Sequence, residues 1–138
     1  MATQNDVRRI ASGLPGVNEG TGRFGFDVEV KGKRKGFCWS WMERVDPKKA
    51  RVENPAVLAI RVPDLADKEA LHASDPDGEK FVQDPHYNGF PAVLVRLKAI
   101  RVPQLRELLT DAWRSMAPKQ DVVDYDARST RGGRRPTV

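Results

Sequence analysis

The 138-residue sequence has one cysteine, two histidines and no long apolar run, and each scarcity excludes a class of protein. The single cysteine, Cys38, cannot form an internal disulfide, so nothing indicates an oxidising compartment. His72 and His86 stand far apart and lack the ligand spacing of structural zinc sites. No segment reaches the roughly 18 apolar residues of a membrane span, and the first residues lack the pattern of a secretory signal. We therefore expect a cytoplasmic protein with no membrane segment, metal or other cofactor.

The common catalytic and phosphate-binding motifs are also missing from the sequence. Cys38 has an aromatic neighbour on each side, and apolar surroundings keep a thiol protonated and inert. Gly20, Gly22 and Gly25 have the spacing of a dinucleotide-binding loop, but they lead into an expected strand instead of joining a strand to a helix. No G-x-S-x-G sequence is present. The chain is therefore predicted not to be an enzyme.

Length and hydrophobic periodicity predict one α+β domain. A chain of this length with 39% hydrophobic residues can bury a single modest core. Apolar residues with helical or alternating spacing predict helices over 5–14, after residue 64 and over 103–117, and strands over 23–30, 37–41, 57–62, 81–82 and 93–97. The alternation of Phe37, Trp39 and Trp41 predicts one shared face, and residues 44–55 are predicted to form a loop. These elements indicate an antiparallel β-sheet flanked by helices.

The predicted domain occupies residues 1–120, and residues 121–138 are predicted to form a flexible tail. The composition of this tail turns to Arg, Ser, Thr, Gly and Pro, which is typical of disordered ends. The chain carries a net charge of +5, and residues 126–138 alone carry +3. Two interpretations stay open. The tail is either an arm that contacts phosphate through Arg131, Arg134 and Arg135, or a solubilising end.

The expected hairpin of residues 23–42 is a candidate site for nucleic acid because its turn is basic. Its turn region contains the cations Lys31, Lys33, Arg34 and Lys35. Arg23 brings the number of cations in the hairpin to five, and Asp27 and Glu29 reduce the net charge of the hairpin to +3. A basic hairpin can contact phosphates without reading base sequence, and exposed tryptophans can stack on bases. The alternative is a solvated turn whose aromatic neighbours are buried beneath the helices.

A second candidate site lies in the turn of residues 84–91. His86 and Tyr87 stand between Pro and Gly residues, and loops of this kind often hold functional side chains. A pocket formed by His86, Tyr87 and Trp113 would accept a small molecule or a protein partner. The alternative is structural, with Tyr87 and Phe90 packed against Trp113.

Several segments, in a fixed order, resemble one known family. They are Leu14-Pro15-Gly16-Val17, Phe24-Gly25, Gly32-Lys33, residues 55–60 and residues 84–91, followed by the apolar run 93–97 and the helical segment 105–119. Together these segments, which span about residues 5–120, resemble the MmcQ/YjbR family. The chain departs from that family in its Arg-rich tail and at Ala92, where the family often has an aromatic residue.

The resemblance implies a compact α+β fold of the double-wing kind and a DNA-binding role, and it supplies no catalytic residues. Two hypotheses follow. The first is DNA binding through phosphate contacts from Lys31, Lys33, Arg34 and Lys35, assisted by the tail arginines. The second is a small-molecule or protein-partner module that uses the pocket at His86, Tyr87 and Trp113. A monomer is favoured.

Overall fold

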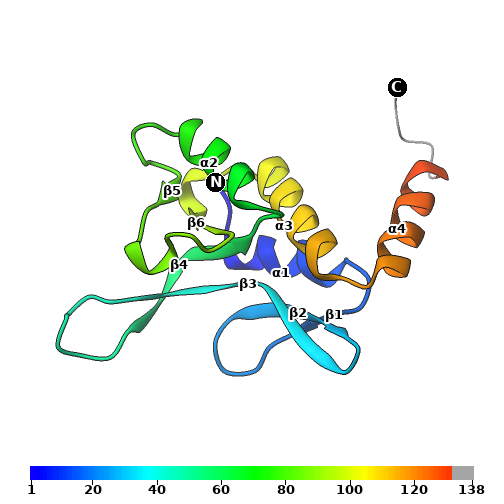
Figure 1. Ribbon diagram of the computed structural model, residues 1–138, viewed down its shortest axis with the longest axis horizontal. Helices are drawn as coiled ribbons and strands as arrows, with labels where there is room; N and C mark the ends of the chain where they lie inside the picture. Colours follow the sequence, from blue (N-terminus) through cyan, green and yellow to red (C-terminus); the bar gives the residue numbers. More distant parts are fainter. Residues whose placement is uncertain (132–138) are drawn as a thin grey trace.

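Within residues 1–131, which the computed structural model describes, six strands pair into one antiparallel sheet with helices packed beside it (Figure 1). The elements are α1 (Gln4–Ser12), β1 (Val17–Glu19), β2 (Gly25–Val30), β3 (Lys33–Glu43), β4 (Val52–Arg61), α2 (Leu65–Ala73), β5 (Phe81–Val82), η1 (Pro85–Tyr87), β6 (Ala92–Arg96), η2 (Leu97–Ala99), α3 (Val102–Met116) and α4 (Lys119–Arg131). The sheet order is β1-β2-β3-β4-β6-β5. The predicted α+β class, with an antiparallel sheet flanked by helices, is confirmed. No helix in the described range is long and apolar enough to cross a membrane.

Side-chain caps start two of the helices. Thr3 and Asp6 form a capping box at α1, in which the Thr3 hydroxyl accepts from the Asp6 amide and the Asp6 carboxylate accepts from the Thr3 amide. At α2, the Asp64 carboxylate accepts from the Asp67 amide at 2.9 Å. Both helices therefore begin near the positions that the sequence predicts.

A β-bulge in β3 decides which side chains face each side of the sheet. Phe26 of β2 pairs with Cys38, whereas the next residue of β2 pairs with Gly36. Phe37 is therefore an extra residue in β3, opposite no partner of its own. A bulge of this kind interrupts the strict alternation of side chains along a strand.

The bulge corrects the prediction that Phe37, Trp39 and Trp41 share one face. Phe37 and Cys38, although adjacent, both lie in the main core. Trp39 and Trp41 belong to a separate cluster on the other side of the sheet. The sequence pattern missed this change of face because an inserted residue shifts the phase of alternation by one.

The main core lies between the sheet and the pair α1 and α3. Fully buried residues of α3 include Leu105, Leu109 and Trp113, and they pack with buried side chains of the central strands. The indole nitrogen of Trp113 donates a hydrogen bond to the Pro15 carbonyl at 2.9 Å. Trp113 therefore joins α3 to the segment that follows α1.

Two hairpins project from the sheet (Figure 1). The first joins β2 to β3 at Lys31 and Gly32, both of which have positive φ, as the tight turns of hairpins require. The second joins β3 to β4 through residues 44–51. The predicted loop of residues 44–55 is thus shorter than expected, because β4 already begins at Val52.

Residues 121–131, which the sequence assigned to the tail, lie in helix α4. Tyr125 places its ring 5.1 Å from the ring of Trp113, and Asp126 forms an ion pair with Arg114 at 2.6 Å. Val122 also packs against the core. These apolar residues have helical spacing, which the polar composition of the segment obscured. Arg134 and Arg135 lie outside the described residues.

Replacement of Trp113 with Ala is expected to lower the free energy of unfolding by about 3–5 kcal/mol, because it empties a buried volume and leaves the Pro15 carbonyl without its donor. Urea denaturation monitored by circular dichroism measures the change. Arg106→Ala, at an exposed position of the same helix, should change the value by less than about 0.5 kcal/mol. Equal effects of the two substitutions would contradict the assignment of Trp113 to the core.

Candidate functional site

The face of the sheet opposite α1 and α3 carries a second, smaller hydrophobic cluster. Its buried members are Trp41, Val57, Ala59 and Leu94, with Trp39, Val82 and Tyr87 packed against them. The segment of residues 83–91, which includes η1, lies against this cluster through Tyr87. The turn that the sequence marked as a candidate site therefore covers the second face of the sheet.

Hydrogen bonds from one strand, β3, and one helix, α2, hold this turn. The indole nitrogen of Trp41 donates to the Asp84 carboxylate at 2.9 Å, and that of Trp39 donates to the Tyr87 hydroxyl at 3.0 Å. From α2, the ammonium group of Lys68 donates to the Tyr87 and Phe90 carbonyls at 2.5 and 2.9 Å. The turn is thus fixed relative to both the sheet and α2.

Asp84 is the charged centre of these contacts. Burial on its own would raise the pKa of its carboxyl group. The hydrogen bonds from the His86 amide and the Trp41 indole, together with the charge of Arg51 3.8 Å away, outweigh burial and hold the pKa below its usual value. The carboxylate therefore stays ionised at neutral pH and accepts both hydrogen bonds.

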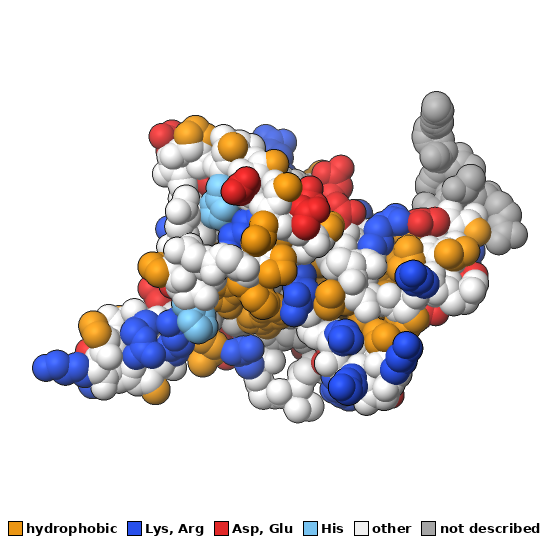
Figure 2. Space-filling model, in the orientation of Figure 1, with side chains coloured by type: hydrophobic (Ala, Val, Ile, Leu, Met, Phe, Trp, Pro, Cys, Tyr) orange, Lys and Arg blue, Asp and Glu red, His pale blue; other side chains and the backbone are white. Residues whose placement is uncertain are grey.

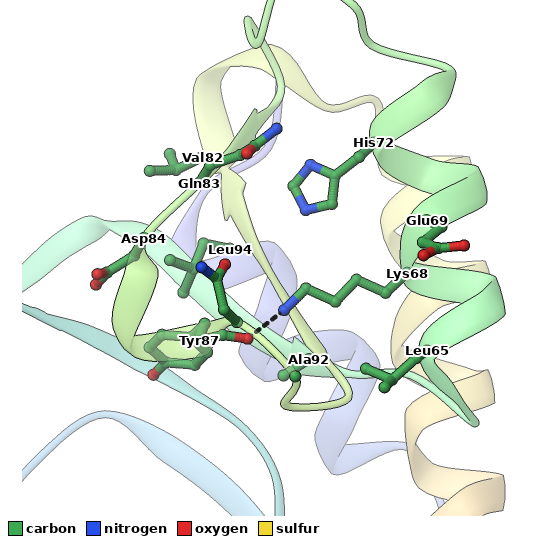
Figure 3. Close-up of a pocket in the computed structure, with 12 residues that line it drawn as sticks. Leu65, Lys68, Glu69, His72, Val82, Gln83, Asp84, Tyr87, Ala92 and Leu94 are labelled. Atoms are coloured by element: carbon green, nitrogen blue, oxygen red, sulfur yellow. Dashed lines mark hydrogen bonds between the residues drawn. The ribbon is translucent and has the colours of Figure 1, made fainter.

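Tyr87 lies between two hollows on this face. The first, which we call the His72 hollow, has a volume of about 460 Å³ and lies between α2 and the turn (Figure 3). Lys68 and His72 project into it from α2. Burial lowers the pKa of Lys68, and burial with the nearby charge of Lys68 lowers that of His72. Burial and the charge of Lys68 thus favour the uncharged form of His72.

The second hollow, which we call the Trp39 hollow, has a volume of about 640 Å³ and lies on the other side of Tyr87. It is lined by Arg23, Trp39, Met42, Arg51, His86, Tyr87 and Phe90. Aromatic rings and cations therefore meet in one concave site. Two features of the sequence indicated a site here, namely the adjacent residues His86 and Tyr87 and the alternating Trp39 and Trp41 of β3.

Both hairpins end in clusters of positive charge. Lys31, Lys33, Arg34 and Lys35 are exposed on the first hairpin, and of these Arg34 forms an ion pair with Asp27 at 3.7 Å. The second carries Arg44, Lys48, Lys49 and Arg51. Figure 2 shows Lys and Arg side chains on both hairpin ends and between them, on one face of the molecule. A patch of hydrophobic side chains lies between the hairpins on the same face.

The second basic hairpin was not predicted from the sequence. Residues 44–51 contain four cations and one carboxylate, a net charge of +3 that matches the signal in the first hairpin. The prolines nearby favoured a loop, so the segment was not placed in a hairpin that projects from the sheet. The charge density was visible in the sequence, whereas its position beside the first hairpin required the fold.

The predicted pocket is only partly assembled. His86 and Tyr87 lie side by side, with ring centroids 5.7 Å apart. Trp113 does not join them, because it is buried in the main core on the other side of the sheet. The alternative prediction, that Tyr87 and Phe90 pack against Trp113, is also wrong, because both residues lie beside Trp39.

The remaining predicted residues are placed as follows. Cys38 is fully buried, and burial raises the pKa of its thiol. Among residues 1–131, no group of three or more His, Cys, Asp or Glu side chains is arranged to hold a metal ion. Arg131 is the final residue of α4, and Arg134 and Arg135 lie outside the described range.

Comparisons with known proteins identify relatives and a shared fold. No family model matches the chain. The uncharacterised proteins Rv2570 of Mycobacterium tuberculosis and Mb2600 of Mycobacterium bovis are each 39% identical to it over 135 residues, covering 94% of this chain and 99% of each relative. The crystal structure of Deinococcus radiodurans protein DR2400, a DUF419 domain, has a similar fold, with a TM-score of 0.61 and 23% identity over 82% of this chain and 77% of that one.

Acid should weaken the contacts of Asp84. Its folded pKa lies below the unfolded value of 3.8, so its contribution is present above that value and is lost as the pH falls through the folded pKa. Asp84→Asn is therefore expected to lower the melting temperature more at about pH 6 than at about pH 3. Thermal melts of both proteins across this range measure the difference. A difference in melting temperature that does not change with pH would contradict the role of the ionised carboxylate.

Proposed function

The chain belongs to the same family as the mycobacterial protein Rv2570, and we propose that it is a nucleic-acid-binding protein, with DNA as its partner. We also propose that this family is of the MmcQ/YjbR type, since the DUF419 domain that shares its fold is related to MmcQ/YjbR. The motifs of residues 84–91 and 105–119 support this assignment. The projecting hairpins would be the two wings of a double-wing protein.

The separation of charge within the chain is the observation that carries the proposal. Residues 31–35 have four cations and no carboxylate, a net charge of +4, and residues 44–51 have a net charge of +3. The whole chain has only +5, so the rest of the molecule is net acidic. Concentrated positive charge on two exposed hairpins is what contact with a polyanion requires, and general solubility does not require it.

The hairpins suit contact with the phosphate backbone more than the reading of bases. Apart from the half-buried Arg51, their cations are exposed, and most are lysines. A lysine ammonium group acts as a mobile point charge without the fixed geometry of paired hydrogen bonds. Phosphate contacts position a protein but carry no sequence information directly. We therefore infer that affinity is strongly dependent on salt and weakly dependent on base sequence.

The His72 hollow favours a second candidate function, the binding of a small molecule. Its volume of about 460 Å³ lies within the range of about 300–1,000 Å³ that is common for ligand pockets. Lys68 already donates to two carbonyls at one end of the hollow, and its other polar lining groups, Glu69, His72, Gln83 and Asn88, could contact a ligand. A small-molecule site of this kind would not respond to charge reversal in the hairpins.

Charge reversal in the first hairpin should weaken binding to duplex DNA. The triple variant Lys33→Glu, Arg34→Glu, Lys35→Glu is expected to raise the Kd at low salt by at least about 10-fold, because it replaces attraction to phosphates with repulsion. Fluorescence anisotropy with a labelled duplex measures the Kd. In the wild type, log Kd should rise with log salt by about 0.9 per phosphate contact, and the slope should be smaller in the variant.

A matched control reverses three exposed cations elsewhere, with the substitutions Lys98→Glu, Arg101→Glu and Arg106→Glu. Lys98 lies in η2, Arg101 directly precedes α3, and Arg106 lies in α3. This variant has the same net charge as the hairpin variant. The proposal predicts a much smaller loss of affinity. If the two variants bind equally weakly, only net charge matters and the hairpin is not the contact surface. If the wild type binds neither duplex nor single-stranded DNA at low salt, the proposed function is wrong.

The second hairpin should contribute independently of the first. Lys48→Glu with Lys49→Glu is expected to raise the Kd for duplex DNA and to reduce the salt slope by about two contacts. Because the two sets of substitutions lie at opposite ends of β3, their losses should add on a logarithmic scale. The same anisotropy titration tests this. Unchanged affinity in the Lys48 and Lys49 variant would restrict the interface to the first hairpin.

A further inference from the structure

The Trp39 hollow lies between the two basic hairpins and is not needed for contact with phosphates. Its volume of about 640 Å³ lies within the range of about 300–1,000 Å³ typical of ligand pockets. Trp39, Tyr87 and Phe90 supply three aromatic rings to it, and all three side chains are only half-buried. Open aromatic surface in a concave site is suited to a flat, apolar group.

The rings are held in place before any ligand arrives. The ring of Phe90 lies 5.9 Å from that of Tyr87 and 6.3 Å from that of Trp39, in edge-to-face arrangements. The hydrogen bond from the Trp39 indole to the Tyr87 hydroxyl links the sheet to the turn. The guanidinium of Arg61 lies over the Phe90 ring at 5.1 Å. A site ordered in advance avoids much of the entropy cost of binding.

Positive charge surrounds the rings. Arg23 and Arg51 line the same hollow, and His86 is exposed at its edge. Arg51 is partly engaged, since it donates to the Met42 carbonyl at 3.0 Å and faces Asp84 at 3.8 Å. Arg23 is exposed and forms no ion pair within residues 1–131. The occupant that fits is therefore a flat ring joined to a negative charge.

We propose that the Trp39 hollow binds an unpaired base of a single-stranded nucleic acid, whose phosphates follow the cations of the two hairpins. The inference rests on the proposed function, because the hairpins supply the phosphate contacts. Base stacking on aromatic side chains is tolerant of sequence, since every base has a π face. A paired base in a duplex has its faces covered by its neighbours. An apolar peptide would leave the cations at the edge without a counter-charge.

The test compares two labelled probes with equal numbers of phosphates, an oligothymidylate of about 12 nucleotides and its abasic counterpart. The full-length wild type should bind the oligothymidylate about 10-fold or more tightly than the abasic strand in anisotropy titrations. An oligouridylate of the same length is a third probe, which distinguishes RNA from DNA as the source of the base. Tighter binding of either base-bearing strand than of the abasic strand supports the inference.

Substitutions then locate the base. Trp39→Leu and Phe90→Leu should each reduce the preference for the base-bearing strand while leaving the affinity for the abasic strand unchanged. Trp39→Phe, which keeps an aromatic ring, should retain most of the preference. Binding should also quench tryptophan fluorescence in the wild type, and the quenching should be smaller in Trp39→Phe. Phe90 lies at a half-buried position in the turn, so the Phe90→Leu variant still tests the base site if Trp39→Leu does not fold.

The outcomes separate this inference from the proposed function. Equal affinity of the wild type for the two DNA strands, with binding that depends on the hairpin lysines, would overturn the base site and leave phosphate binding intact. A preference for the base that Trp39→Leu and Phe90→Leu do not change would also overturn it. Absence of binding to every probe at low salt would overturn both.

Discussion

The inserted residue Phe37 is the constraint on which the rest of the structure depends. Because it has no partner in β2, the two residues Phe37 and Cys38 both enter the main core, and Trp39 and Trp41 turn to the opposite face. Without this change of phase, strict alternation would put Phe37 on the same face as Trp39 and Trp41 and remove it from the main core. The bulge thus lets one strand supply aromatic side chains to both faces, and the tryptophans of the second face hold the turn of residues 83–91.

That second face connects local structure to the proposed function. The indole groups of Trp39 and Trp41 each donate to a residue of the turn, so the strand that carries the bulge also fixes the walls of the Trp39 hollow. β3 continues past this point in both directions and forms one side of both basic hairpins. A single long strand therefore positions the first hairpin, the aromatic hollow and the second hairpin in sequence along one face. The remainder of the molecule is net acidic, which favours approach of a polyanion to the two hairpins.

Much of the fold could be predicted from the sequence, because its signals are local. Periodic apolar residues, the Asp64 cap and the tight turn at Lys31 and Gly32 each act within a few residues. The features that were missed depend on partners far away in the chain. The bulge is defined by pairing with β2, and α4 is held by Tyr125 against Trp113. Only part of the candidate site could be predicted, because its other parts also depend on contacts between distant segments. The charge of the first hairpin and the His86-Tyr87 pair are visible in the sequence, whereas the exclusion of Trp113 and the place of the second hairpin required the sheet.

The central claim is that one face, formed by two basic hairpins and the aromatic hollow between them, binds nucleic acid. An NMR titration of the ¹⁵N-labelled protein with an unlabelled single-stranded oligonucleotide tests it most directly, because backbone amides report on contacts throughout the described chain. The account predicts that the largest shift changes fall within residues 31–35, 44–51 and 86–90, with a smaller response in α1 and α3. Shift changes confined to α1 and α3, or none at low salt, would contradict it.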